Sequence, residues 1–337
     1  MSADHPFYLA INEGVSVAKP EDDLLHTEQN RGIEGDSLTE TQYFGFNVPE
    51  HDIHAMGYIW HHPNLGVVTG GLMAWQGIKR YSVAAELFDI RAYLSDAVLK
   101  NDMHDVQLEN SYRTRVLEPM KRFQMTYNDE ARGNHVDVQF EAVTPGVMFG
   151  DGKHLEQGLR TKGALVLRGK EYAVNGYNVR DRSWGKLRPE NVMGIPPVAW
   201  MTGWFGDDFI FNCNLMDHAG SSPLSTDKFA LPLEHALNGG WVARDGKLKR
   251  IVKAHKTVDR DPDTFLARRI NLQVTTEDDQ ELSITGRLIA ACPWHTWPNM
   301  VANICLIRWE CEGRVGHGDS QDVIWNDFAH AWQPKRY

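Results

Sequence analysis

Short runs of alternating apolar and polar residues follow one another along this chain, and turn-forming residues separate most of them. The runs 54–60 and 67–75 are rich in aromatic and apolar residues, and Pro63 to Gly66 supply a turn between them. Strands that follow one another through short turns are typical of an antiparallel sheet. The pattern predicts strands at 43–48, 54–60, 67–75, 105–109, 111–117, 122–127, 135–143 and 163–168 in the first half of the chain.

The second half of the chain repeats this pattern. Gly206, Asp207 and Asp208 form a turn between two of its apolar runs. Helical periodicity is scarce, and only 93–99 and 232–237 are short candidates for helices. The pattern predicts further strands at 198–204, 209–215, 248–255, 267–274, 282–290 and 304–313.

Two sets of strands in 337 residues indicate two domains, because one domain commonly holds about 150 residues. The predicted fold is all-β, with two antiparallel lipocalin-like β-barrel domains in tandem and few short helices. The first domain covers residues 1–188, including an irregular acidic arm at 1–40, and the second covers 189–337. A barrel of about eight strands can enclose one small ligand, and the alternation fits a filled core as well as a lined cavity.

Charge and cysteine content exclude several classes of protein. The formal net charge of −10 argues against a nucleic-acid surface, which needs basic patches. The four cysteines form no Cys-x-x-Cys pair, and His61 and His62 would point to opposite faces of a strand, so we expect no metal site. No stretch approaches 18 consecutive apolar residues, and the first residues lack the pattern of a signal peptide. We therefore expect a cytoplasmic protein without a membrane span.

The stretch 177–185 (Tyr-Asn-Val-Arg-Asp-Arg-Ser-Trp-Gly) holds the densest cluster of chemically useful side chains. It places Asp181 between two arginines and close to Trp184. A carboxyl group desolvated against an aromatic wall has a raised pKa, so it can remain protonated and donate a proton to an apolar substrate. The alternative is an arginine–aspartate pair that closes one end of a barrel, with Trp184 as a core plug, since ion pairs also perturb pKa values.

Other side chains are candidates for the same site. His154 titrates near neutrality and is a candidate base, so the candidate catalytic set is Asp181, Trp184 and His154. Aromatic residues around the site would stabilise a developing cation. Each candidate has a structural alternative, because tryptophans also plug cores, His154 also suits a turn, and 293–298 also suits a rigid aromatic loop. The candidate substrate-binding residues are Arg182, Gln157, Tyr58, Trp60, Trp204, His295 and Trp297.

Three parts of the chain resemble the carotenoid 1,2-hydratase-like (hydroxyneurosporene synthase-like) superfamily. They are 154–159 with 162–165, 176–185, and 309–318 with 321–322, and the likeness extends over most of 40–327. The resemblance implies tandem lipocalin-type barrels. The family motif has the form Asp-His-x-Trp-Gly, which reads Asp181-Arg182-Ser183-Trp184-Gly185 here.

The arginine in this motif is a departure from the family. The resemblance implies acid chemistry at the histidine and tryptophan of the motif, but an arginine keeps its proton near neutral pH and cannot shuttle protons. Arg182 could instead hold Asp181 or bind an oxyanion. We therefore expect an apolar tunnel with an acid at one end, and not the carotenoid substrate.

Two functions of different class follow from these observations. The first is an enzyme without cofactor that hydrates, dehydrates, isomerises or cyclises an apolar small molecule such as a terpenoid, steroid or polycyclic compound. The second is a non-catalytic carrier of a hydrophobic ligand, because fold does not imply function; a structural role in an assembly is a weaker third. A carboxyl group of Asp181 that opens into a cavity favours the enzyme, and one sealed by Arg180 and Arg182 favours the carrier.

Overall fold

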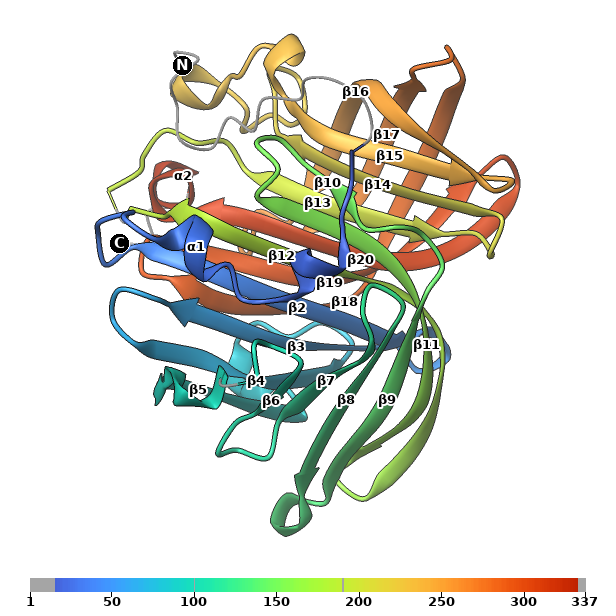
Figure 1. Ribbon diagram of the computed structural model, residues 1–337. Helices are drawn as coiled ribbons and strands as arrows, with labels where there is room; N and C mark the ends of the chain where they lie inside the picture. The colour runs from blue at the N-terminus through green and yellow to red at the C-terminus, as the bar shows by residue number, and fades with distance from the viewer. Residues whose placement is uncertain (1–15, 100, 190, 333–337) are drawn as a thin grey trace. The chain divides into compact units, whose positions relative to one another are not determined.

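The computed structural model describes residues 16–332, apart from 100 and 190, and residues 1–15 of the predicted arm lie outside this range. The chain divides into two compact units (Figure 1). The N-terminal unit comprises 16–76 and 83–189, and the C-terminal unit takes in 77–82 and the described residues after 190. The predicted domains meet between residues 188 and 189. The segment 77–82 belongs to the C-terminal unit because Lys79 and Gly77 exchange backbone hydrogen bonds with Ala291.

The N-terminal unit is one antiparallel sheet with strand order β5-β4-β3-β2-β12-β11-β9-β8-β7-β6, and β10 joins β1 to β11. Short 3-10 turns and one helical turn, α1 (Thr27–Asn30), connect its elements. The strands are β1 (Ser16–Val17), β2 (Leu38–Val48), β3 (Ile53–His62), β4 (Val67–Gln76), β5 (Leu87–Ser95), β6 (Asp105–Gln107), β7 (Arg113–Glu118), β8 (Arg122–Asp129), β9 (Asn134–Ala142), β10 (Val147–Met148), β11 (His154–Leu167) and β12 (Lys170–Leu187).

The C-terminal unit is a closed barrel of eight antiparallel strands in sequence order, followed by helix α2 (Asn326–Trp332). The predicted all-β class with barrel-type sheets is therefore confirmed. The strands are β13 (Val198–Trp204), β14 (Phe209–Met216), β15 (Leu237–Arg244), β16 (Lys247–Arg260), β17 (Ala267–Thr276), β18 (Glu281–Trp297), β19 (Met300–Cys311) and β20 (Arg314–Trp325).

Both predicted helices are wrong. Leu94 and Ser95 pair with β4, so the segment 93–95 ends β5, and Asp96–Leu99 forms only a 3-10 turn. At 232–237 the structure has a three-residue 3-10 turn, Leu233–His235, before β15 begins. Strand pairing at 94–95 and at Leu237 limits each segment to one short turn and overrides a weak local helical preference.

Side chains fill the interior of each unit. In the N-terminal unit, Phe44 packs against Phe123 and Phe140, with ring centroids 5.4 and 5.0 Å apart. In the C-terminal barrel, Phe211 and Trp309 meet edge to face at 5.2 Å, and a Cβ at Gly203 would lie 2.2 Å from Phe211. At these positions, side chains pack closely in the interior of each unit.

The N-terminal sheet is buried on both of its faces at β2 and β3. Every residue of β2 is buried, and nearly all of β3 is as well. Because successive side chains of a strand point to opposite faces, both faces of the sheet are covered here. The face with Phe44 and Ile59 is the apolar core, and we call the other the outer face. Within the part of the chain that the structure describes, no helix is long and apolar enough to cross a membrane.

Candidate functional site

The stretch 177–185 forms the end of β12, which lies between β2 and β11 in the sheet (Figure 1). The strand alternation directs Arg180, Arg182 and Trp184 to the core face, and Asp181 and Ser183 to the outer face. The motif that looks like one cluster in the sequence is therefore divided between two environments.

Arg180 is paired on the core face. Its Nη1 donates to Asp23 at 2.6 Å and its Nε donates to the side-chain oxygen of Gln157 at 2.7 Å. The guanidinium carbon lies 4.1 Å from the ring centroid of Phe123. Arg180 and Asp23 are almost fully buried, so this ion pair is part of the packed interior.

Arg182 is paired on the same face. Its guanidinium donates to the carboxylate of Glu40 and to the backbone carbonyl of Asp23. Glu40 also accepts from His26 Nδ1 at 2.8 Å and from Asn30 at 3.1 Å. Burial acts to raise the pKa of Glu40, but the His26 hydrogen bond and the Arg182 charge outweigh it, and the pKa lies below its usual value.

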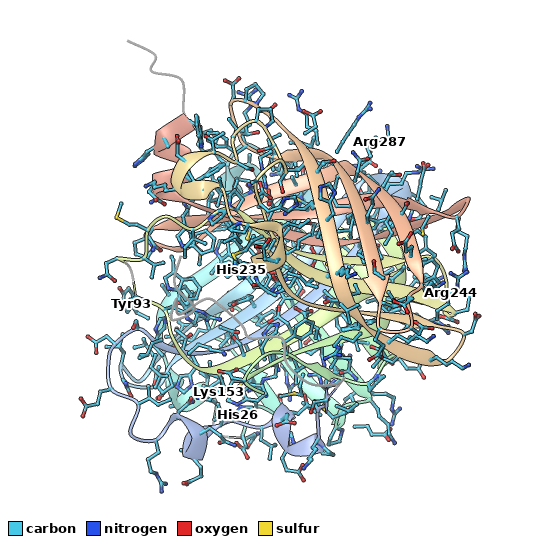
Figure 2. All side chains as sticks on the ribbon, turned by 90° about the horizontal axis from the view of Figure 1, so that it is seen from above. His26, Tyr93, Lys153, His235, Arg244 and Arg287 are labelled. Atoms are coloured by element: carbon cyan, nitrogen blue, oxygen red, sulfur yellow. The ribbon has the colours of Figure 1, made fainter. Side chains whose placement is uncertain are left out.

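Trp184 belongs to this core-face cluster. Its ring stacks on His26 at 3.7 Å with an interplanar angle of 6°, and it packs against Leu155. His26 and Lys153, both labelled in Figure 2, lie beside Trp184. The Lys153 carbonyl accepts a hydrogen bond from the Trp184 backbone N–H at 3.1 Å. Trp184 and Asp181 therefore lie on opposite faces of β12 and do not line one pocket.

The outer face carries a row of acids and phenols, which we call the acid row. Strand register places Glu156 of β11 opposite Asp181 of β12, Asp181 opposite Tyr43 of β2, and Tyr43 opposite Tyr58 of β3. Directly opposite side chains on adjacent strands have Cβ atoms about 4.5–5.5 Å apart. All four side chains are buried, with exposed fractions of 9% or less.

A second row runs beside the first. It joins His154 to Ser183, Ser183 to Thr41, and Thr41 to Trp60. His154 Nε2 lies 3.1 Å from the Glu156 carboxylate. Burial lowers the pKa of His154 to about 4, although the Asp181 charge opposes this. The imidazole is therefore neutral at pH 7, and burial makes it a weaker base than an ordinary histidine.

Tyr58 remains a neutral phenol. Burial raises its pKa to about 12, the Asp181 charge adds to this, and the Arg188 charge acts in the opposite direction. The next position of its row is Gly71 of β4, where φ is +145° and a Cβ would lie 1.9 Å from the Asp89 carbonyl oxygen. No side chain can therefore cover Tyr58 from that position.

Apolar side chains continue the outer face beyond the phenols. The alternation of β3 and β4 places Met56, Met73 and Trp75 on it, and all three are fully buried. His54 meets Trp75 edge to face at 5.1 Å. The outer face therefore has an acidic end, formed by the acid row, and an apolar end, formed by these methionine and aromatic side chains.

The other predicted site residues lie elsewhere. Gln157 is on the core face, where it bonds Arg180 and two backbone carbonyls. Trp204 and Trp297 are buried at the ends of β13 and β18, and His295 is an exposed residue of β18. These three belong to the C-terminal unit. The residues that sequence reasoning missed are Tyr43, Glu156, Thr41, Ser183 and Arg188, of which only the acid Glu156 carried a visible signal, two residues after His154.

Among the residues that the structure describes, no three His, Cys, Asp or Glu side chains come close enough together to hold a metal ion. The four cysteines are free and buried.

Known proteins share this fold at low sequence identity. A putative AttH from Nitrosomonas europaea is 11% identical, with a TM-score of 0.59 over 89% of this chain and 96% of its own. Kievitone hydratase from Nectria haematococca is 9% identical, with a TM-score of 0.53 over 90% of this chain and 94% of its own. CghA is 12% identical, with a TM-score of 0.60 over 96% of both chains.

These likenesses show the fold alone, because the identities are so low. None of the curated proteins matches the chain. One family model matches residues 19–328, which is nearly the whole described chain, and its description is a domain of unknown function, DUF7064. The chain therefore belongs to the DUF7064 family.

Proposed function

We propose that the acid row is the site of an acid–base enzyme, a hydratase, dehydratase, isomerase or cyclase, that acts on an apolar small molecule such as a terpenoid, steroid or polycyclic compound. The observation that carries the proposal is the placement of two carboxyl groups, Glu156 and Asp181, opposite each other on adjacent strands, beside two phenols and a neutral imidazole. Like charges at this separation disfavour ionisation of both groups. We propose that the pair retains one proton.

The proposed reaction moves protons between this chain's side chains and the substrate. In hydration, Asp181 delivers its proton to one carbon of a double bond, and water adds to the other carbon. His154, oriented by Glu156 at 3.1 Å, accepts the proton that the water loses. Proton transfer from His154 back to Asp181 restores the site. Dehydration is the same sequence reversed, and isomerisation omits the water.

The hydrogen bonds of Arg180 and Arg182 support this role over that of a carboxylate sealed between these two arginines. The two neighbouring arginines are bound to Asp23, Glu40 and Gln157 on the core face. The hydrophobic end of the outer face suits an apolar substrate. The name of one protein of the same fold, kievitone hydratase, and the resemblance to the carotenoid 1,2-hydratase-like superfamily point to the same class of reaction.

A screen in heavy water tests the proposal. The purified protein is incubated in D2O with terpenoid, steroid and polycyclic alkenes and alcohols, and mass spectrometry records deuterium on carbon and gain or loss of water. We expect turnover that Asp181→Asn lowers about 10²–10⁴-fold without lowering the melting temperature, because asparagine cannot donate a carboxylic proton. The control is Asp137→Asn, at an exposed position of β9.

The outcomes of the screen separate the enzyme from a carrier. Full turnover by folded Asp181→Asn would reject the catalytic role of the acid row. Ligands that raise the melting temperature of the wild-type protein and emerge without deuterium or added water would identify a carrier instead.

A further inference from the structure

A chain of hydroxyl groups connects Tyr58 to Arg188 on the outer face. Arg188 Nη2 donates to Ser183 Oγ at 2.8 Å, and Ser183 Oγ lies 2.7 Å from Thr41 Oγ1. The Thr41 side chain in turn hydrogen-bonds the phenol of Tyr58. Three strands, β12, β2 and β3, and the residue that follows β12 contribute one group each.

The arginine can only be a donor at the start of this chain, because a guanidinium only donates hydrogen bonds, so Ser183 Oγ accepts from Arg188. In the arrangement in which each hydroxyl donates once toward Tyr58, Ser183 gives its hydrogen to Thr41 Oγ1. Thr41 then gives its hydrogen to the Tyr58 oxygen. A phenol oxygen that accepts from Thr41 directs its own hydrogen to a different acceptor.

Arg188 is held firmly at the start of the chain. Its Nη1 donates to Thr39 Oγ1 at 2.8 Å and its backbone N–H donates to the Ser37 carbonyl at 3.0 Å. Its side chain is partly buried, so its charge is less screened than at the surface. The charge therefore polarises each hydroxyl of the chain toward donation at the far end, which is Tyr58.

We infer that Tyr58 is the group of the acid row that donates a hydrogen bond to an oxygen atom of the substrate, and that Arg188, Ser183 and Thr41 position it. The substrate class is then an apolar ketone whose carbonyl is conjugated to the reacting double bond. This inference rests on the proposed function for its reaction, but its binding test below stands by itself.

The atoms of the step balance without any further reactant. Water adds to the carbon remote from the carbonyl and loses a proton to His154. The electron pair of the double bond moves toward the carbonyl, whose oxygen becomes an enolate oxygen bound by Tyr58. Asp181 then protonates the carbon next to the carbonyl, the carbonyl reforms, and the product is a β-hydroxy ketone. Donors aimed at an oxygen where negative charge develops are a large source of catalysis.

Two probes that share one aromatic skeleton test the assignment. 2-Naphthol carries an oxygen on the aromatic skeleton of naphthalene, and both probes are titrated by their fluorescence against the full-length protein. We expect 2-naphthol to bind at least tenfold more tightly than naphthalene, which corresponds to about 1.4 kcal/mol. Tyr58→Phe should remove this preference and leave naphthalene binding unchanged. Tyr112→Phe, the same change at a fully buried tyrosine of the core, should keep it.

Variants along the chain of hydroxyl groups distinguish a positioning role from a purely structural role. Thr41→Val should reduce the preference for 2-naphthol, whereas Thr41→Ser, which keeps the hydroxyl, should retain it. Arg188→Met should reduce it as well. Melting temperatures are recorded for each variant, so that a loss of fold is not read as a loss of binding.

Three results would overturn the inference. They are equal affinities of the wild-type protein for the two probes, failure of the wild-type protein to bind 2-naphthol up to its solubility limit, and a preference that survives in Tyr58→Phe. A preference that depends on Tyr58, in a protein that exchanges no deuterium with any compound of the screen, would reject the enzyme and leave Tyr58 as a ligand-binding group.

Discussion

The two faces of β12 balance buried charge in opposite ways. On the core face, Arg180 and Arg182 each meet a carboxylate at a fixed position, and the N-terminal segment supplies Asp23 for this purpose. On the outer face, Asp181 and Glu156 lie beside hydroxyl groups and a neutral imidazole, and the charge of Arg188, whose guanidinium donates to two hydroxyl groups, acts on Asp181. A carboxylate bound directly to a guanidinium is held in its ionised form, because the opposite charge lowers its pKa. The comparison supports a structural role for the core face, and our proposal places the chemistry on the outer face.

The C-terminal barrel supports this reading of the core face. There Arg260 bonds Asp217 at 3.0 Å and Asp322 at 2.6 Å, and Lys256 bonds Asp217 at 2.7 Å, all of them buried. The positive charges act against burial and hold the pKa of Asp217 below its usual value. Buried networks of positively charged side chains and carboxylates therefore occur in both units.

The largest effect is expected from breaking the core-face network. Arg182→Met leaves the carboxylate of Glu40 buried without its guanidinium, and loss of one partner of a buried pair costs about 3–5 kcal/mol. Urea unfolding should show this loss of stability. Arg31→Met, which removes an exposed pair with Glu28, should change stability by about 1 kcal/mol or less. Equal stabilities of the two variants would mean that the core-face network does not hold the fold.

A smaller effect is expected from acid on the outer face. The pKa of His154 is about 4 in the folded protein and 6.5 ordinarily, so the unfolded chain binds a proton between these values and the folded chain does not. Stability therefore falls as the pH drops from 6.5 to 4, by about 3 kcal/mol from this residue. His154→Asn removes that part of the pH dependence.

Unfolding at pH 7 and pH 4 measures this difference. Other histidines with lowered pKa, such as His61 and His218, contribute equally to both proteins and cancel in the comparison. His135→Asn, at an exposed position, serves as the control and should follow the wild-type curve. Parallel curves for His154→Asn and the wild type would show that the imidazole is not held neutral.

The smallest effect is expected from a change at Trp184. This variant tests whether the motif tryptophan belongs to the core face or to the substrate site. Trp184→Phe keeps an aromatic ring against His26 but loses part of the stack, and aromatic pairs contribute about 0.5–1.5 kcal/mol. We expect a loss of stability of about 1 kcal/mol and no change in the turnover that Asp181→Asn lowers. A large fall in turnover at unchanged melting temperature would return Trp184 to the substrate site.

The fold was predictable from the sequence where local alternation determines it. The strands at 54–60 and 67–75 and the turn between them follow from the spacing of apolar residues and turn formers, and the structure confirms them. The pairing of β12 with β2 was not predictable, because Asp181 and Tyr43 lie far apart in the sequence and register depends on the whole sheet.

The composition of the site was predictable only in part. Asp181 and His154 share the outer face as the sequence suggested, whereas Trp184 was grouped with Asp181 by nearness in the sequence. An odd spacing of three along a strand places two side chains on opposite faces, and this was the unused signal. The position of the family histidine, Arg182 here, faces the core, so the family motif alone could not locate the acid row.

The ion pair between Asp23 and Arg180 also bears on how the chain reaches its fold. The two residues are 157 positions apart, and contacts of such separation form slowly because a long loop must close first. During synthesis the N-terminal segment emerges early and its partner strand emerges late. The N-terminal segment therefore cannot form these contacts until β12 has been synthesised. Its packing against Arg180 and Arg182 then completes the N-terminal unit.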